Sequence, residues 1–424
     1  MKNIGTIIKL KRIEQGISQE ELCQGICAPS YLSRIENNRL IADDIIYKLL
    51  FERLGLEYEK YFTTILDLDE RIENWYKCLL ENKPHNEDID ELMELATSSD
   101  ENTFLKFQIV YCRQILLNNN IEEACKILNG LKKIISPELH RNFFIYTEVS
   151  MLFFLKNGEF SKGVEIGTKF LKIAGYESLA NDYELGIFFY NLSLTYKGLL
   201  KYESAMHYAE IALNIFKDGF YLEDCLACYI VLGICYNNIK KWKKSIETYK
   251  LAKRLLTYLP ENDNKRVLCI LNNNMGNCFE YQKKYNEAIN YYLKSLSYIK
   301  NNNEKSQIII NIIRCYYEIR DIKSVKYWLE SAKAIYPRIS KKFQLQIDIY
   351  SALLSYNENI NLLEVIQKDS IKYFISIKDW KLAIRYCHLF ADIYESMSHY
   401  KMANKLNKCL IMCYEKMIFN GGDT

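Results

Sequence analysis

Cysteine and histidine are the residues of this chain that could hold a metal or act as nucleophiles. The 14 cysteines include the C-x-x-C pair Cys225 and Cys228, and two other pairs have the spacing of one helical turn. A zinc site needs four converging ligands, and neither a second C-x-x-C pair nor a nearby histidine completes one. The five histidines are scattered, and no glycine-rich phosphate loop occurs. The sequence therefore predicts no catalytic residue, no metal and no cofactor, and we expect a protein that is not an enzyme.

Asparagine and arginine side chains suit recognition, because they can pair with the backbone and the charged groups of a peptide. Asparagine supplies both a donor and an acceptor, and a guanidinium binds a carboxylate in a two-point fork. The candidates, all expected on one face of the helical repeats described below, are Asn191, Asn274, Asn277, Asn311 and Arg314. The alternative, in a chain this rich in asparagine, is that these residues only cap and link helices.

A short segment near the N-terminus carries side chains that suit DNA. A helix that begins at Pro29 would present Ser30, Tyr31 and Arg34 outward, and a guanidinium can bind guanine at two points in the major groove. The net charge is only +3, and residues 1–66 hold nine Lys or Arg against nine Asp or Glu. DNA binding would therefore depend on a local arrangement of charges rather than on a broad basic surface. The alternative is a small helical docking module whose charges are solvated.

Short helices must position these side chains, and the first 66 residues contain the signals for five of them. Apolar residues from Ile4 to Ile13 follow helical spacing, and Gly16 ends that helix. The segment Ser18-Gln19-Glu20-Glu21 has the form of a capping box, so a second helix begins there. The remaining helices are expected over Ser30–Asn37 and around Asp43–Leu54 and Glu57–Leu66.

This head resembles the Xre-type (lambda-repressor-like) helix-turn-helix family. The resemblance covers about the first 66 residues and is carried by Ile17-Ser18-Gln19-Glu20-Glu21-Leu22 and Tyr31-Leu32-Ser33-Arg34-Ile35-Glu36-Asn37-Asn38-Arg39. Leu22 and Glu36 are fourteen residues apart, one fewer than is common, which is typical of peptide-sensing regulators such as PlcR and NprR. The resemblance implies that Gln19 and Arg39 hold phosphates, and we place Asn38 in the same DNA-contacting set. It also makes Lys9, Lys11 and Arg12 supporting phosphate contacts, which fix register without carrying sequence information.

The rest of the chain repeats itself about every 40 residues. Anchors at Ile115, Phe154, Tyr196, Tyr236, Phe279 and Tyr316 are spaced by 39, 42, 40, 43 and 37 residues, and small residues such as Ala205 and Ser245 follow at a fixed distance. A further copy centres on Tyr394, and the gap leaves room for a degenerate copy near Tyr356. The pattern resembles the tetratricopeptide repeat, in which small residues let two helices approach closely. We expect about eight hairpins over residues 100–420, stacked as a right-handed superhelix with a concave groove, and a linking hairpin over residues 67–99.

An Xre-type head on a tetratricopeptide body resembles the quorum-sensing regulator family that includes Rgg, Rap, NprR, PlcR and PrgX. The resemblance implies an all-α homodimer that binds a palindromic promoter site through its head and a short signalling peptide in its groove. In other tetratricopeptide proteins, the positions of Asn274 and Asn277 grip the backbone or terminal carboxylate of a ligand. Two alternatives stay open: control of a response-regulator protein by the repeats, as in Rap proteins, and a repressor that no peptide affects.

The composition agrees with a cytoplasmic protein. Apolar residues make up 49% of the chain and charged residues 26%, the profile of a globular protein. No apolar run approaches the ~20 residues that a membrane span needs, and the first residues lack the apolar core and cleavage site of a secretion signal. The cysteines are therefore expected to be free thiols in a reducing compartment. Double-stranded DNA and a short peptide, and no membrane, are the expected partners.

Overall fold

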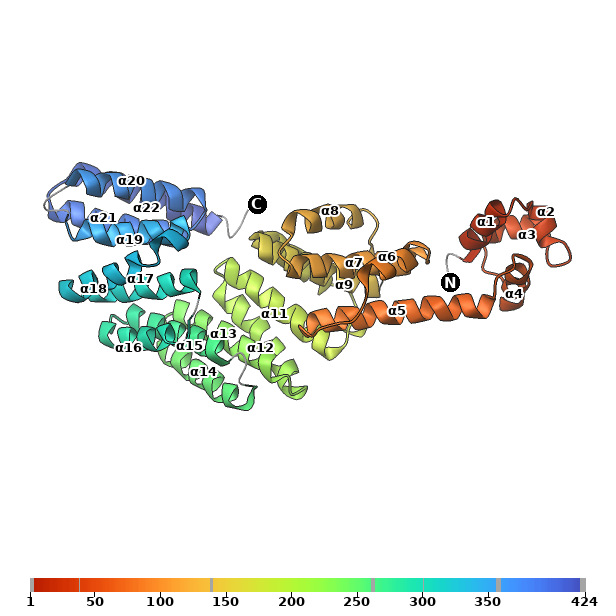
Figure 1. Cartoon of the computed structure of the whole chain (residues 1–424), viewed down its shortest axis with the longest axis horizontal. Coiled ribbons are helices and arrows are strands. Elements are labelled where there is room, and N and C mark those ends of the chain that lie inside the picture. The colour runs from red at the N-terminus through yellow and green to blue at the C-terminus, as the bar shows by residue number, and fades with distance from the viewer. Residues whose placement is uncertain are drawn as a thin grey trace. The chain divides into compact units, whose positions relative to one another are not determined.

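The computed structural model describes residues 4–37, 39–137, 140–260, 264–299, 301–355 and 360–419. Every regular element within these ranges is helical, and the helices follow one another in antiparallel pairs after a small N-terminal head (Figure 1). The predicted all-α fold is therefore confirmed. None of the described helices is long and apolar enough to cross a membrane.

Four helices form the head, and local sequence signals determine where they begin. They are α1 (Ile4–Glu14), α2 (Gln19–Cys23), α3 (Pro29–Glu36) and α4 (Asp44–Arg53). The predicted capping box starts α2: the Ser18 hydroxyl accepts from the backbone N–H of Glu21, and the Ser18 N–H donates to the Glu21 carboxylate at 2.8 Å. Pro29 occupies the first turn of α3, where its missing N–H costs nothing. The core of the head includes the fully buried side chains of Ile8, Leu22, Leu32, Ile35 and Leu50.

The next helix differs from the prediction. Helix α5 runs over Tyr58–Leu80, 23 residues, and does not end at Leu66. Leu68, Ile72 and Trp75 continue the helical spacing of apolar residues and are buried, and Pro84 is the first proline or glycine after Tyr58. Nothing in the sequence therefore interrupts the helix at the expected boundary. Helix α6 (Ile89–Thr97) follows α5, so the segment predicted as a linking hairpin is the second half of a long helix paired with a short one.

Eight further helical hairpins follow within the described residues, as the repeat spacing predicted. In the colours of Figure 1 they run from orange-brown through green to blue. The pairs are α7 (Glu101–Leu117) with α8 (Ile121–Leu131), α9 (Arg141–Asn157) with α10 (Phe160–Phe170), α11 (Asp182–Gly198) with α12 (Tyr202–Asp218), α13 (Leu222–Asn238) with α14 (Trp242–Leu255), α15 (Asn264–Tyr281) with α16 (Tyr285–Leu296), α17 (Asn302–Glu318) with α18 (Ile322–Lys333), α19 (Lys341–Leu353) with α20 (Ile360–Ser376), and α21 (Trp380–Ser396) with α22 (Tyr400–Phe419).

The repeats exceed the usual tetratricopeptide length because several helices are long, with 17 residues each in α11, α12 and α13, and because short 3-10 helices lie between some hairpins. These are η2 (Tyr176–Leu179), η3 (Leu256–Tyr258) and η5 (Tyr336–Arg338). Pro337, the predicted terminating proline, lies in η5. The degenerate copy expected near Tyr356 corresponds to the pair α19 and α20, although Tyr356 itself is outside the described residues.

Small residues let the two helices of a hairpin approach, as the repeat pattern required. A Cβ atom on Gly233 of α13 would lie 2.3 Å from the ring of Tyr249 on α14, and one on Gly276 of α15 would lie 2.5 Å from the ring of Tyr292 on α16. Both rings are almost completely buried. The ring of the second helix thus occupies the space that a side chain on the first helix would need.

The chain divides into two compact units, which we describe separately. The N-terminal unit comprises residues 1–157 and 165–184, and the C-terminal unit comprises residues 158–164 and 185–424. The domain limits at residues 66 and 99 stay predictions.

Candidate DNA-binding helix and candidate ligand pocket

The outward face of α3 carries the side chains predicted to contact bases. Ser30 and Arg34 are exposed, and Tyr31 is half-buried because its ring packs against the core of the head. Arg39 is exposed just after the helix, where its backbone N–H donates to the Arg34 carbonyl at 2.8 Å. Asn38, predicted as a further DNA contact, lies outside the described residues.

A buried carboxylate supports α3 from behind. Glu36, only 2% exposed, accepts from Arg12 Nε at 2.6 Å and from Arg12 Nη2 at 2.9 Å, which joins α3 to α1. The amide nitrogen of Gln19, at the start of α2, donates to the same carboxylate at 2.6 Å. The hydrogen bonds that Arg12 donates to Glu36 raise the pKa of Arg12, although burial acts in the opposite direction. All three helices therefore meet at one charge, which sets the orientation of α3 in the head.

This cluster involves two residues that the sequence assigned to phosphate, and those assignments stay predictions. Arg12 was expected to support phosphate binding, but its guanidinium is held by Glu36 and by the carbonyl of Ile17. Gln19 was also assigned to phosphate, and its amide nitrogen is already engaged. The signal that could have revealed the cluster was Glu36 itself, a carboxylate adjacent to Ile35 at a buried position of an amphipathic helix. A buried charge is rarely unpaired, so a partner arginine was to be expected.

A polar pocket in the C-terminal unit brings together four of the five predicted ligand-binding residues. Asn274 and Asn277 of α15 and Asn311 and Arg314 of α17 line this pocket, which has a volume of about 290 Å³. Asn191 of α11 is buried and does not line it. We call it the asparagine pocket. Sequence reasoning missed several other lining residues, among them Asn237, Asn273, Gln307, Lys381 and Arg385.

Hydrogen bonds hold much of the asparagine pocket in place. Asn311 accepts from Gln307 at 3.1 Å and from Arg314 Nη2 at 2.9 Å, and its amide donates to Asn273 at 3.1 Å. The side-chain oxygen of Asn277 accepts from the Tyr292 hydroxyl at 2.8 Å. The capacity of Asn311 is therefore largely used within the protein. Asn274, in contrast, has no hydrogen-bond partner among the described residues.

Arg314 has an internal carboxylate partner, which corrects the expectation that its fork is open to a ligand. Its Nη2 donates to Glu280 at 2.8 Å, and its Nε also donates to Glu280. Burial alone would raise the pKa of Glu280, but the charge and hydrogen bonds of Arg314 hold that pKa below its ordinary value. The third nitrogen, Nη1, is buried without a hydrogen-bond partner within the described part of the chain.

Two lining residues of the asparagine pocket thus have unsatisfied buried atoms, Arg314 Nη1 and the side-chain oxygen of Asn237. A buried donor or acceptor without a partner costs about 1–3 kcal/mol. One is a donor and the other an acceptor, and a peptide bond offers the complement of each. The arrangement suits a ligand with amide or carboxylate groups.

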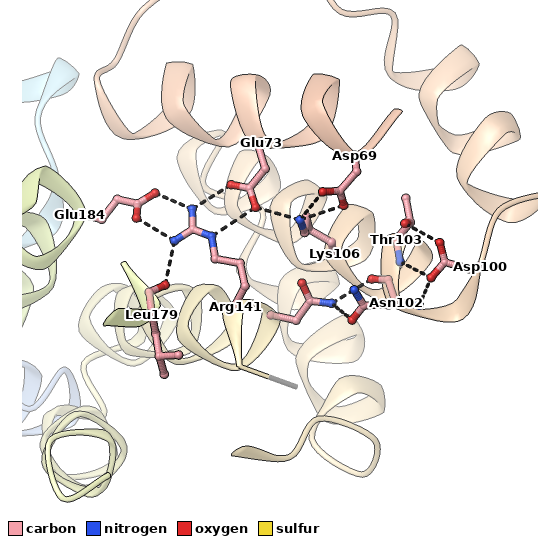
Figure 2. A network of polar contacts seen from close by, with 10 residues as sticks. Asp69, Glu73, Asp100, Asn102, Thr103, Lys106, Arg141, Leu179 and Glu184 are labelled. Carbon is pink, nitrogen blue, oxygen red and sulfur yellow. Dashed lines mark hydrogen bonds and ion pairs between the residues drawn. The ribbon is translucent and has the colours of Figure 1, made fainter. Parts of the chain in front are cut away.

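The long helix that follows the head is tied to the repeats by a charge network. Figure 2 shows Arg141 of α9 between Glu73 of α5 and Glu184 of α11. Arg141 Nη2 lies 2.8 Å from a Glu73 oxygen and 2.6 Å from a Glu184 oxygen. Lys106 of α7 lies 2.8 Å from both Glu73 and Asp69 of α5. Burial would raise the pKa of Glu73, but Arg141 and Lys106 together hold it below its ordinary value.

The two cysteines of the C-x-x-C pair have the properties of buried core residues. Cys225 and Cys228 are buried in α13, and burial raises the pKa of both thiols. A thiol with a raised pKa is a poor nucleophile at neutral pH. Among the residues that the structure describes, no group of three or more His, Cys, Asp or Glu side chains is arranged to hold a metal ion.

Both the head and most of the whole chain are similar to known proteins. Residues 8–59 match the helix-turn-helix family. The chain is 26% identical over 416 residues to the transcriptional activator NprA of Geobacillus stearothermophilus, and the match covers 94% of this chain and 100% of that protein. The similarity therefore extends through both the head and the repeats.

Two solved structures share the fold. The apo form of the quorum sensor NprR from B. thuringiensis has a TM-score of 0.66 at 16% identity, covering 82% of this chain and 99% of that chain. NprR in complex with its cognate peptide NprX has a TM-score of 0.58 at 18% identity, covering 81% of this chain and 98% of that chain. At these identities the likeness shows the fold alone. A helix-turn-helix head followed by tetratricopeptide-like hairpins is the architecture of this chain, and the resemblance drawn from the sequence is confirmed at that level.

Proposed function

We propose that this chain is a DNA-binding transcriptional regulator controlled by a short signalling peptide that binds in the asparagine pocket. The proposal makes the chain a regulator rather than an enzyme. The observation that carries it is the pocket itself, because Arg314 Nη1 and the Asn237 side-chain oxygen are buried there without hydrogen-bond partners among the described residues. A ligand that forms hydrogen bonds with both atoms gains affinity, because it removes a cost that polar groups at an open surface, already bonded to water, do not have.

The DNA-binding part of the proposal rests on the head. Helix α3 presents Ser30, Tyr31 and Arg34, with Arg39 beside its end, and the match to the helix-turn-helix family supports its use as the recognition helix. Arg34 would contact a guanine base. Gln19, Asn38 and Arg39 would contact the phosphate backbone of the DNA. The similarity to NprA, a transcriptional activator, agrees with this role.

The ligand-binding part rests on Asn274, Asn277, Asn311 and Arg314. Asn274 has free hydrogen-bonding capacity, and the other three hold one another and their neighbours in place. The fold is shared with NprR bound to its cognate peptide NprX, which supports a peptide as the ligand. We also propose a cytoplasmic homodimer on a palindromic site, with half-sites one helical turn or a multiple apart.

The experiment that tests the proposal is fluorescence-anisotropy titration of DNA from upstream of the chain's own gene. Titrations are made with and without synthetic peptides encoded by a neighbouring small open reading frame. We expect specific binding whose affinity changes with peptide. Arg34→Ala should weaken specific binding by about tenfold to a hundredfold, because one bidentate base contact is lost.

Matched variants separate the two parts of the proposal. Asn274→Ala should leave DNA binding without peptide unchanged and reduce the peptide effect by about fivefold, since one hydrogen bond is lost. Arg266→Ala and Asn214→Ala remove an exposed arginine and an exposed asparagine elsewhere. They should change neither DNA binding without peptide nor the effect of peptide on it. DNA binding that no peptide affects would indicate a constitutive repressor. An absence of specific DNA binding would favour control of a protein partner.

A further inference from the structure

A second pocket in the C-terminal unit adjoins the asparagine pocket. It has a volume of about 400 Å³ and is lined by the start of α10, the end of α11, the start of α21 and Met417 of α22. Asp379 and Lys381 line both pockets. The shared lining residues show that the two pockets are neighbours.

The second pocket differs in character from the first. Its side chains include Phe160, Leu199, Ile377, Trp380 and Met417, so it offers apolar and aromatic surface, and we call it the apolar pocket. The end of α11 packs closely on the start of α10 here, because a Cβ atom on Gly198 would lie 2.5 Å from the ring of Phe160. Ser161 adds one polar atom: its hydroxyl is buried and has no hydrogen-bond partner among the described residues.

The charges of the asparagine pocket do not balance. Four cations line it, but Arg314 is paired with Glu280, and Lys342 lies 2.6 Å from Asp379. The remaining two, Lys381 and Arg385, have no carboxylate within ion-pair distance in the described part of the chain. Four cations and two carboxylates leave a net charge of +2.

The surroundings of Lys381 agree with this excess. Among the described residues, its ammonium donates one long hydrogen bond, 3.4 Å to the hydroxyl of Tyr202. Burial lowers the pKa of Lys381, Asp379 raises it in part, and the cations Lys197 and Arg385 lower it further. An added negative charge would therefore be stabilised at this place.

We propose that the two pockets bind one short peptide, whose acidic group contacts Arg385 and Lys381 while a bulky apolar side chain of the same peptide enters the apolar pocket. This inference rests on the proposed function and adds the chemistry of the ligand. The acidic group is a side-chain or C-terminal carboxylate, which a guanidinium binds in a two-point fork. The backbone between the two groups runs past Asp379, where the pockets meet. Burial of the apolar side chain supplies affinity that the polar contacts lack.

The test measures direct binding of peptide pools to the full-length protein. Four pools of synthetic heptapeptides are used: with both Asp and a bulky apolar residue, with Asp only, with the apolar residue only, and with Asn and Ala in place of both. Isothermal calorimetry gives the affinity. The fluorescence of Trp380, one of four tryptophans in the chain, serves as a local signal, which Trp380→Phe should remove with little loss of affinity. We expect the doubly featured pool to bind at least about tenfold more tightly than either single pool.

Two variants assign each preference to its pocket. Arg385→Gln should abolish the preference for Asp, a loss of about tenfold, and keep the apolar preference. Trp380→Ala should abolish the preference for the apolar residue and keep the preference for Asp. Trp380→Phe should restore the apolar preference if packing is the cause. Arg320→Gln removes an exposed arginine outside both pockets and should change neither preference.

The outcomes distinguish this inference from the proposed function. Equal binding of all pools, or no binding of any, overturns the inference. A preference that survives both Arg385→Gln and Trp380→Ala also overturns it. If the doubly featured pool binds as expected but DNA affinity is unchanged by it, the inference stands and peptide control of DNA binding fails.

Discussion

At the scale of single residues, buried charged side chains hold neighbouring helices together. Glu36 in the head joins Arg12 of α1, Gln19 of α2 and its own helix α3. Arg314 and Glu280 do the same between α15 and α17 in the repeats. A buried pair of this kind is weak evidence for net stability, because desolvation offsets the attraction, but breaking one partner leaves an uncompensated charge. The orientation of α3 and of the Arg314 side chain therefore depends on a buried carboxylate.

The first prediction concerns Glu36. Glu36→Gln should destabilise the head by about 3–5 kcal/mol, because Arg12 stays buried without its counter-charge. DNA affinity should fall for all sequences alike, since α3 loses its support rather than a base contact. Chemical unfolding of the full chain, with hydrogen exchange on peptides from the head, measures the change.

The control for that prediction is Glu14→Gln. Glu14 pairs with Lys11 at 2.7 Å, but both side chains are about half exposed. Such a surface pair contributes about 0–1 kcal/mol. If the two substitutions destabilise the head equally, the Glu36 cluster does not hold its helices in place.

At the scale of elements, the two helices of a hairpin pack closely where a small residue on one faces a large ring on the other. Gly233 and Gly276 leave space for the rings of Tyr249 and Tyr292 within one hairpin each. The hairpins that carry the asparagine pocket are built in this way, since α13 and α15 both line it. The position of Asn274 and Asn277 therefore depends on glycines that no ligand contacts.

The second prediction compares two glycines in helices. Gly233→Ala should destabilise the α13–α14 hairpin by about 1–3 kcal/mol, because the new methyl group displaces the buried ring of Tyr249. Gly130→Ala in α8 meets nothing within 4 Å and should be neutral or stabilising by up to about 1 kcal/mol. Thermal unfolding and hydrogen exchange on peptides from each hairpin measure both. A stabilising effect of alanine at Gly233 would contradict the close fit.

At the scale of the whole molecule, the question is how a ligand in the repeats affects the head. Helix α5 begins just after the head and contains Glu73. Arg141 joins Glu73 to Glu184, which lies in the first turn of α11, a helix that continues into the C-terminal unit. The network in Figure 2 therefore joins α5 to the start of α11 within the N-terminal unit, and we propose that it takes part in coupling the repeats to the head. Coupling between two ligands is a free energy and must be reciprocal.

The third prediction tests that connection. Arg141→Gln should reduce the factor by which peptide changes DNA affinity, while the affinities for peptide alone and DNA alone change little. Arg71→Gln is the matched control, because Arg71 also pairs from α5 but only with Glu87 and Glu91, outside the repeats. The measurement is DNA affinity with and without peptide, together with peptide affinity with and without DNA. An unchanged coupling factor in Arg141→Gln would place the connection elsewhere.

Local signals in the sequence were sufficient for the type and order of the elements. The capping box at Ser18, the proline at the start of α3 and the small residues of the repeats each act over a few residues, so their spacing predicted the helix-turn-helix and the eight hairpins. The continuation of α5 past Leu66 also follows from the apolar spacing from Leu68 onward, because the end of a domain need not coincide with the end of a helix.

The tertiary structure alone decided which residues share a site. The asparagine pocket combines α13, α15, α17 and α21, and Asn311 and Arg385 are 74 positions apart in the chain. Periodicity places a side chain on a face of its own helix, but the partner across the groove depends on how successive hairpins stack. For the same reason the sequence could not show that Asn191 does not line this pocket, or that Arg314 is paired with Glu280. Spacing along the chain determines secondary structure, whereas burial and charge pairing arise only when distant helices come together.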